Sequence, residues 1–206
     1  MIQEPLPDPL EVRGFRIFAG LLDRAAQDRL AADLRAVVAA APLVRPVTRR
    51  GRALSVRMTS AGEVGWVSDR RGYRYEARHP SGVAWPPIPA SARAVWDAVA
   101  PRARAPDSCL VNWYGPDARM GMHQDRDEAD LDQPVVSISL GDDARFRIGD
   151  VERGGATESV ILRSGDVVVM GGAARLRHHG IDRIVAGTSD LLPAPGRINV
   201  TLRVAR

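Results

Sequence analysis

The chain has 206 residues, 45% of them hydrophobic and 26% charged, which suits one soluble globular domain. Its single cysteine, Cys109, excludes an intramolecular disulfide, and neither a signal peptide nor a membrane span is expected, because the first residues are proline-broken and no apolar run reaches about 18 residues. The net charge of +4 is modest, and we expect a cytoplasmic protein that acts as a monomer.

Two helices are predicted in the first half of the chain. The first is capped by Asp23 and runs to about Ala41, because apolar residues recur at helical spacing over 30–41 and Pro42 follows. The second spans about 91–99 and has a similar apolar face. Both helices are therefore expected in an N-terminal extension that ends near residue 107.

The stretch between the two helices is rich in Arg, Gly and aromatic residues, with short strand-like pieces such as 53–58. From Arg45 to Arg78 there are nine arginines and three acidic residues, a local charge of 9 − 3 = +6 that leaves −2 for the rest of the chain. Such a cluster favours a phosphate-bearing partner, although a solvated face is the alternative. The arginines expected to contact phosphate are Arg49, Arg50, Arg52, Arg70, Arg71 and Arg74.

From Ser108 onward the pattern changes to short strands separated by Gly, Asp and Pro turns. The predicted strands are 135–140, 144–148, 159–162, 166–170 and 198–204. Regularly spaced short strands indicate a sandwich or barrel, and a double-sheet jelly roll fits best in about 100 residues. We therefore predict one domain of the α+β class, mainly β, with a double-stranded β-helix core over 108–206 and the extension over 1–107.

A metal site is indicated by the spacing of His123, Asp125 and Asp127. In an extended chain these residues share one face, so an imidazole and a carboxylate can meet one ion. A remote histidine, either His178 or His179, would complete two histidines and one carboxylate, which leaves positions open for a cosubstrate and O₂ at non-haem Fe(II). The His-x-Asp spacing alone is a weak signal, because a histidine is more often structural than ligating.

The last predicted strand has one polar and one apolar face. Arg197, Asn199, Thr201 and Arg203 alternate with apolar residues. A solvated edge strand would show the same pattern. The alternative is a polar face that lines a cavity holding a dicarboxylate, since a guanidinium binds a carboxylate through two parallel hydrogen bonds. An iron site combined with such a strand is what a 2-oxoglutarate enzyme requires.

Several segments, taken in order and spacing, make the sequence resemble the AlkB family of alkylation-repair dioxygenases. The resemblance covers about residues 48–204. The matching segments within the predicted core are 110–115, 123–128, 134–141, 165–172, 179–180 and 197–203. Four further segments precede the core, at 58–59, 65–66, 72–75 and 85–89, and these resemble the bacterial branch of the family.

The resemblance implies that His123, Asp125 and His179 hold Fe(II). Adjacent strand residues point to opposite faces, so only one of His178 and His179 can reach the ion, and the His-Gly pair of the family selects His179.

The resemblance also implies a set of cosubstrate contacts. Arg197 would pair with the distal carboxylate of 2-oxoglutarate, and Arg203 would lie near its metal-chelating end. Asn112, Tyr114 and Asn199 would form hydrogen bonds to it. From the residues alone, Asn112 and Tyr114 would instead be interpreted as a satisfied polar pair on a strand.

For the damaged base, the resemblance implies a pocket under a lid at about 45–90. Its residues would be Thr48, Met58, Trp66, Tyr73, Asp127 and Arg153, with the ring of His123 on the iron side. Core packing is the alternative for Trp66 and Tyr73, but their place in a Gly-rich basic stretch favours a lid. Aromatic surfaces there would replace the stacking that a flipped base loses, about 1–3 kcal/mol per base.

The implied activity is oxidative dealkylation of N-alkylated bases, such as 1-methyladenine and 3-methylcytosine, in single-stranded DNA and also RNA. Fe(II), O₂ and 2-oxoglutarate would be used, and succinate, CO₂ and an aldehyde released. Two alternatives stay open. One is the same chemistry on tRNA or another RNA, a protein side chain or a small molecule. The other is a non-catalytic nucleic-acid-binding protein.

Overall fold

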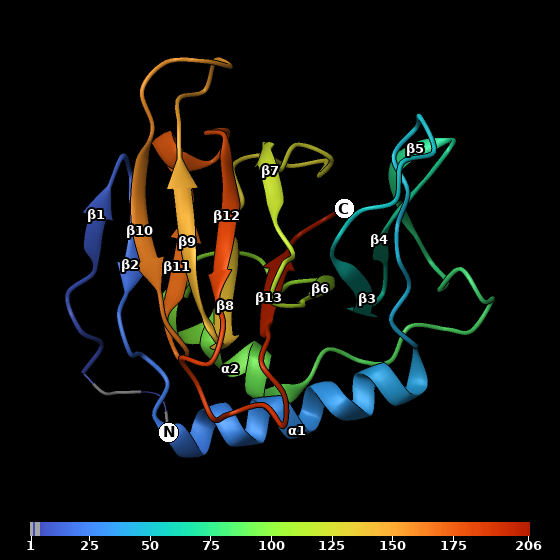
Figure 1. Cartoon of the computed structure of the whole chain (residues 1–206), viewed down its shortest axis with the longest axis horizontal. Coiled ribbons are helices and arrows are strands. Elements are labelled where there is room, and N and C mark those ends of the chain that lie inside the picture. Colours follow the sequence, from blue (N-terminus) through green and yellow to red (C-terminus); the bar gives the residue numbers. More distant parts are fainter. Residues whose placement is uncertain (1, 3–4) are drawn as a thin grey trace.

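Two β-sheets face each other in the computed structural model, which describes residue 2 and residues 5–206 (Figure 1). In this part of the chain the major sheet has seven strands, in the order β1 (Leu10–Val12), β2 (Phe15–Phe18), β11 (Val167–Met170), β8 (Val135–Gly141), β13 (Arg197–Arg203), β6 (Ser108–Tyr114) and β3 (Arg57–Gly62). The minor sheet has four strands, in the order β10 (Glu158–Leu162), β9 (Asp143–Ile148), β12 (His179–Val185) and β7 (Met120–His123). All of these strand pairs are antiparallel. The predicted jelly roll is confirmed.

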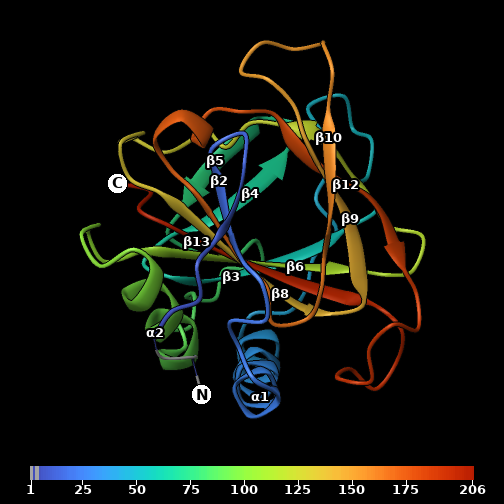
Figure 2. The same ribbon diagram turned by 90° about the vertical axis from the view of Figure 1, so that its left-hand side faces the viewer.

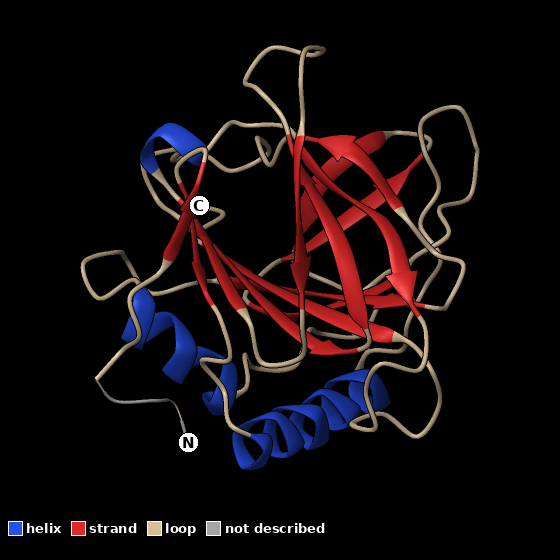
Figure 3. Cartoon of the chain, turned by 60° about the vertical axis from the view of Figure 1, so that its left-hand side comes forward, coloured by secondary structure: helices blue, strands red, loops and turns tan. Residues whose placement is uncertain are grey.

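Both helices pack on the outer face of the major sheet (Figure 2; Figure 3). α1 (Arg24–Ala40) begins after Asp23, whose side chain accepts a hydrogen bond from the backbone N–H of Ala26 at 2.8 Å. α2 (Ala90–Val99) begins after Pro89. A short 3₁₀ helix, η1 (Gly172–Ala174), follows β11. In the described residues no helix is long and apolar enough to cross a membrane.

Alternation along the central strands separates a helix-facing core from a cavity between the sheets. On β13, Val200 and Leu202 belong to the cluster that contains the helices. Arg197, Asn199 and Arg203 point the opposite way, into the space between the sheets. This is the period-two pattern predicted for the strand, and it places polar groups where a ligand can lie.

The third sheet, the hairpin of β4 (Gly65–Asp69) and β5 (Gly72–Glu76), lies beside β3 (Figure 1). We refer to β4–β5 as the lid hairpin.

The extended piece expected at 53–58 lies further along the chain. The strand is β3, Arg57–Gly62, and only its first two residues overlap the expected range. β3 forms through its backbone pairing with β6, from Arg57 opposite Trp113 to Gly62 opposite Ser108. Its buried Thr59 and Ser60 give no hydrophobic signal in the sequence. The major sheet therefore takes in strands that precede residue 108.

Candidate active site

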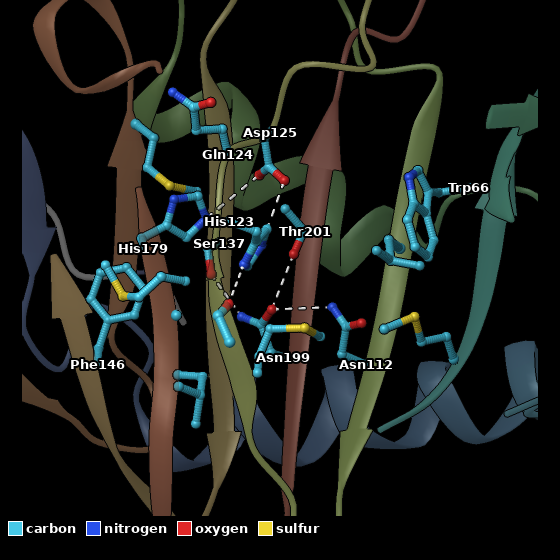
Figure 4. Close-up of a pocket in the computed structure, with 18 of the residues that line it drawn as sticks. Trp66, Asn112, His123, Gln124, Asp125, Ser137, Phe146, His179, Asn199 and Thr201 are labelled. Atoms are coloured by element: carbon cyan, nitrogen blue, oxygen red, sulfur yellow. Dashed lines mark hydrogen bonds and ion pairs between the residues drawn. The ribbon is translucent and has the colours of Figure 1, made fainter. Parts of the chain in front are cut away.

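A cavity of about 270 Å³ lies between the two sheets and is open toward the lid hairpin. The predicted site residues that line it are Met58, Trp66, Tyr73, Asn112, Tyr114, His123, Asp125, Asp127, His179, Arg197, Asn199 and Arg203. Figure 4 shows several of these side chains converging from β6, β7, β12, β13 and the lid. One cavity thus brings together residues that are up to 145 positions apart in the sequence (58 to 203).

The proposed metal ligands meet where β7 ends and β12 begins. His123 and His179 are register partners of these two strands, and Asp125 follows two residues after His123. One potential ligand atom from each of the three lies within 4.8 Å of the others. The Nε2 atoms of His123 and His179 are 3.9 Å and 3.8 Å from the two oxygens of Asp125 (Figure 4).

Backbone carbonyl groups orient both imidazole rings. Nδ1 of His123 donates to the carbonyl of Gly121 at 2.9 Å, and Nδ1 of His179 donates to that of Arg177 at 3.1 Å. Each Nε2 therefore keeps its lone pair for a metal ion, because a neutral imidazole carries one proton. Burial lowers the pKa of His179 to about 4, with a smaller contribution from His123, so His179 is neutral at neutral pH.

Close packing of β12 against β7 requires a glycine at position 180, directly after His179. A Cβ at this position would lie 2.6 Å from the carbonyl oxygen of Met120 and 2.9 Å from that of Gly121. Both atoms belong to the backbone of β7 and cannot move away cheaply. The glycine therefore lets β12 approach β7 closely enough for the two histidines to meet.

His178, the rival for the third ligand, directly precedes β12 and is turned away from the cavity. Its Nδ1 bonds to the carbonyl of Asp150 at 3.0 Å, in the loop that joins β9 to β10, and it does not line the cavity. Of the two neighbouring histidines, His179 faces Asp125.

Arg203 holds the carboxylate of Asp125. Its Nη2 is 3.0 Å from Oδ1 of Asp125, and both side chains are about nine-tenths buried. Burial alone would raise the pKa of Asp125, but Arg203, His179 and His123 together bring the pKa well below its usual value. Asp125 is therefore an anion whose Oδ1 faces Arg203 and whose Oδ2 faces Nε2 of His179.

Arg197 is fully buried, and no carboxylate lies within ion-pair distance of it in the described residues. Its guanidinium donates to the carbonyls of Asp142 and Leu162 and to the hydroxyl of Ser139, and its Nε has no hydrogen-bond partner there. Burial lowers its pKa to about 10, so it remains a cation. A buried guanidinium with an unused N–H fits the carboxylate of a bound acid.

The amide groups next to Arg197 form a polar row across β6, β13 and β8. Nδ2 of Asn112 donates to Oδ1 of Asn199 at 3.3 Å, and Nδ2 of Asn199 donates to the hydroxyl of Ser137 at 2.7 Å. Oδ1 of Asn112 is buried and has no hydrogen-bond partner among the described residues. Tyr114 is buried, and burial raises its pKa, so its hydroxyl keeps its proton. These groups offer hydrogen bonds to a ligand at the base of the cavity.

The lid hairpin supplies an aromatic wall opposite the histidines. Trp66 and Tyr73 are stacked with their ring centroids 5.4 Å apart, and Nε1 of Trp66 donates to Oδ2 of Asp127 at 3.0 Å. Tyr73 is 50% exposed, whereas Met58 is buried in the cavity wall. The mutual stacking leaves one face of Trp66 for a flat ligand.

Two of the predicted base-pocket residues lie outside the cavity lining. Thr48 sits in a turn where its backbone N–H and hydroxyl contact the backbone of Arg52. Arg153 is exposed in the β9–β10 loop. The turn around Gly51 and the turn of the lid hairpin pack together through arginines, since a Cβ on Gly72 would touch the guanidinium of Arg49.

Arg74 is the arginine of the basic cluster whose charge is neutralised most completely. It bonds to Asp69 at 2.8 Å and to Glu76 at 2.5 Å, and its role is therefore within the hairpin. The described residues contain no ion pair for Arg49, Arg50, Arg52 or Arg70. Among the six arginines predicted to contact phosphate, these four are left for an external anion.

Glu128, Arg175 and Tyr75 were not foreseen from the sequence. Glu128 and Arg175 form a buried ion pair at 2.9 Å, and the hydroxyl of Tyr75 donates to Glu128 at 2.5 Å. Arg175 also donates to the main-chain oxygen of Asp125. The acidic residue directly after the His-x-Asp-x-Asp pattern is a signal for Glu128, but nothing local marks its partner 47 residues later.

A jelly roll that encloses two histidines, one carboxylate and a buried arginine defines a class, the non-haem iron oxygenases that use a 2-oxoacid. In agreement, the family model of the 2OG-Fe(II) oxygenase superfamily matches residues 14–203. The "Alpha-ketoglutarate-dependent dioxygenase AlkB homolog" of Caulobacter vibrioides (strain NA1000 / CB15N) is 51% identical over 207 residues, covering 100% of this chain and 93% of that protein. The "Alpha-ketoglutarate-dependent dioxygenase AlkB" of Salmonella typhimurium (strain LT2) is 40% identical over 211 residues, covering 98% and 93%.

The comparison of folds agrees with these sequence similarities. The solved structure of OsALKBH1 superposes with a TM-score of 0.77 at 31% identity and covers 94% of this chain and 99% of that one. The chain belongs to the AlkB family of the 2OG-Fe(II) oxygenase superfamily. It is a dioxygenase whose cofactor is Fe(II) and whose cosubstrates are 2-oxoglutarate and O₂.

Proposed function

We propose that this protein removes alkyl groups from N-alkylated bases, such as 1-methyladenine and 3-methylcytosine, in single-stranded DNA and in RNA, and that it acts as a monomer. The observation that carries the proposal is that one cavity is lined by the two-histidine, one-carboxylate cluster, by the unpaired Arg197 and by the lid pair Trp66 and Asp127. A metal site, an anion site and a flat aromatic surface are the three features that such a reaction needs.

His123, Asp125 and His179 would hold the iron, with both Nε2 atoms and Oδ2 of Asp125 directed at it. When bound, Fe(II) with 2-oxoglutarate and O₂ supplies the oxidation of the alkyl carbon, with succinate and CO₂ as co-products. The hydroxylated adduct then breaks down to the unmodified base and an aldehyde, formaldehyde in the case of a methyl group. This chain's part is to place the base and the cosubstrate on the same side of the three ligands.

Arg197 would pair with the distal carboxylate of 2-oxoglutarate. Its buried charge has no carboxylate partner in the described part of the protein, and its Nε is unused. Asn112, Tyr114 and Asn199 would bind the rest of the cosubstrate, since an unpartnered amide oxygen and a protonated hydroxyl lie beside Arg197. Arg203 would lie near the chelating end, because it already contacts the ligand Asp125.

The base would lie between the free face of Trp66 and the ring of His123, with Met58 in the wall beside it. Tyr73 supports Trp66 from the other face. Asp127 adds a negative charge at the edge of Trp66, which suits a methylated base that carries a positive charge. Thr48 and Arg153 would contact the nucleotide outside the cavity, from the lid turn and the β9–β10 loop.

Single strands are the expected form of the substrate, because unstacking a base costs least there. The arginines at 49, 50, 52 and 70 lie in the turn around Gly51 and in the turn of the lid hairpin, and they form no ion pair in the described residues, so they would be free to contact phosphate. The same features would accept RNA, since the aromatic wall would contact a base and the arginines would contact phosphate, groups that DNA and RNA share.

The test is incubation with single-stranded DNA and RNA that carry one 1-methyladenine, with Fe(II) and 2-oxoglutarate, and with products analysed by mass spectrometry. We expect loss of 14 Da per oligonucleotide, roughly one methylene, together with succinate and formaldehyde in equal amounts. H123A should abolish both products. Succinate release with an unchanged oligonucleotide would assign the chemistry to another substrate, and no 2-oxoglutarate turnover at all would favour a binding protein.

A further inference from the structure

Two hydrogen bonds attach the lid hairpin to the segment that follows the ligand Asp125. Nε1 of Trp66 donates to Oδ2 of Asp127 at 3.0 Å, and the hydroxyl of Tyr75 donates to Oε1 of Glu128 at 2.5 Å. Trp66 and Tyr75 are paired across β4 and β5, and Asp127 and Glu128 are consecutive. The hairpin is therefore attached to two successive residues, and the second of them, Glu128, has further contacts.

Glu128 links this contact to the ligand itself. Its side chain is 2% exposed, Oε1 is 3.2 Å from Nε of Arg203, and Oε2 accepts from Nη2 of Arg175 at 2.9 Å. Arg203 then reaches Oδ1 of Asp125 at 3.0 Å, and Arg175 donates to the main-chain oxygen of the same residue. One carboxylate thus connects Tyr75 of the lid with both the side chain and the backbone of Asp125.

Burying these charged groups costs free energy unless each of them has its partner. Two carboxylates and two guanidiniums are buried together, and removing any partner leaves a charge without compensation. A hairpin that only covered a cavity would need no charged group of this kind beneath it. The hydrogen bonds from Tyr75 and Arg175 fix the Glu128 carboxylate. This carboxylate forms an ion pair with Arg203, and Arg203 in turn lies against Oδ1 of Asp125.

We propose that Glu128 is a positioning residue that couples the placement of the lid hairpin to the placement of the Asp125 carboxylate. Release of Tyr75 frees Glu128 to move, Arg203 follows it, and Oδ1 of Asp125 loses its fixed partner. Lid release then weakens metal binding, and by thermodynamic linkage metal binding favours the attached lid. The proposal rests on the proposed function only for the identity of Asp125 as a metal ligand.

The test compares Y75F with Y73F, a matched Tyr-to-Phe change on the same strand. No hydrogen bond of the Tyr73 hydroxyl exists in the described residues, so Y73F leaves the contact with Glu128 in place. Hydrogen–deuterium exchange of residues 65–76 in the metal-free proteins should be faster in Y75F than in Y73F or wild type. The affinity for Mn(II), measured calorimetrically with 2-oxoglutarate present, should fall about three- to tenfold in Y75F, as expected if part of the free energy of one hydrogen bond to a charged group is transmitted to the metal site.

Three results would overturn the proposal. Exchange in 65–76 that is the same in Y75F and Y73F would show that Tyr75 does not hold the lid. Faster exchange with unchanged Mn(II) affinity would show that the lid and Asp125 are independent. Uniformly faster exchange throughout Y75F would show a loss of overall stability instead of a local attachment. If wild type itself bound no Mn(II), the proposed function would fail, while the exchange comparison would still decide the attachment.

Discussion

At the scale of single residues, Arg197 is the clearest sign of a missing partner. A buried cation without a nearby carboxylate costs free energy, and the hydroxyl and carbonyl groups around Arg197 compensate only part of it. A bound dicarboxylate would complete the compensation. If Arg197 binds 2-oxoglutarate as proposed, the residue links the stability of the protein to the binding of its cosubstrate.

Replacing Arg197 with methionine should separate the two effects. R197M keeps most of the length of the side chain and removes the charge, so 2-oxoglutarate affinity measured calorimetrically with Mn(II) should fall about 100-fold or more, the effect expected when a buried charge pair is deprived of one partner. The ligand-free protein should unfold at the same or a higher temperature. R145M, which changes an exposed arginine of β9, is the control and should bind normally. Unchanged affinity in R197M would contradict the assignment.

The low pKa of His179 predicts how stability depends on pH. Burial lowers this pKa from 6.5 to about 4 in the folded chain. Between these two values the unfolded state binds more protons, so the free energy of unfolding rises with pH and falls as the pH drops from about 6.5 toward 4. The contribution is up to about 3 kcal/mol. Urea denaturation of the metal-free protein at several pH values in this window measures it, and H179Q should show a clearly smaller dependence.

At the scale of elements, the pairing of β12 with β7 decides whether the histidines meet. The register shifts between His179 and Ile181, and Gly180 lies against the backbone of Met120 and Gly121. The geometry of the candidate metal site is therefore a property of a strand pair, and it depends on a residue that has no side chain.

An alanine at position 180 should separate the two strands. Since a Cβ there would lie 2.6 Å from a backbone oxygen, we expect G180A to lose Mn(II) affinity at least about tenfold and to unfold at a lower temperature. G121A is the matched control, because a Cβ at Gly121 meets nothing within 4 Å. Mn(II) titration of both variants provides the comparison, and equal affinity would count against the close approach.

Local signals sufficed for some elements. The capping Asp23 and the prolines at 42 and 89 set the helix ends, and the observed α1 and α2 begin and end within one or two residues of the prediction. β3 was misplaced because its strand character comes from pairing with β6, about fifty residues later, and not from its own composition. Strand pairing over such a distance leaves no trace in a single local window.

At the scale of the whole molecule, charge is distributed unevenly. The excess of +6 lies between Arg45 and Arg78, a segment that includes the lid hairpin, whereas the rest of the chain sums to −2. Two of the three acidic residues already counted in this balance, Asp69 and Glu76, pair with Arg74 inside the hairpin. The remaining arginines form the surface that a polyanion would meet first.

Neutralising three of these arginines should weaken nucleic-acid binding in a salt-dependent way. For R49Q/R50Q/R52Q we expect lower affinity for an unmodified single-stranded oligonucleotide, and a plot of log K against log salt that is flatter by about 0.7 for each phosphate that the variant no longer neutralises. Fluorescence anisotropy at several salt concentrations measures both quantities. The same kind of change on the minor sheet, R145Q/R183Q, serves as the control. A slope identical to wild type would remove the three arginines from the interface.

All of the predicted site residues except Thr48 and Arg153 line the cavity, whereas the contacts that support them were not predicted. The His-x-Asp spacing, the alternating last strand and the family resemblance located twelve residues that line the cavity. The buried set of Tyr75, Glu128, Arg175 and Arg203 is assembled from four distant segments. Arg203 was predicted from the last strand, but no local pattern shows that Tyr75, Glu128 and Arg175 are its neighbours, because they lie in distant segments of the sequence.

The most direct test of the site is a titration with Mn(II), an ion that accepts the same ligands as Fe(II) without being oxidised, in the presence of 2-oxoglutarate. Wild type and H178A should each bind one ion per chain, whereas H179A and D125A should bind none at micromolar concentrations. His178 and His179 are adjacent in the sequence, so comparing H178A with H179A shows which of the two imidazoles binds the ion. Full binding by H179A with loss of binding by H178A would contradict the account.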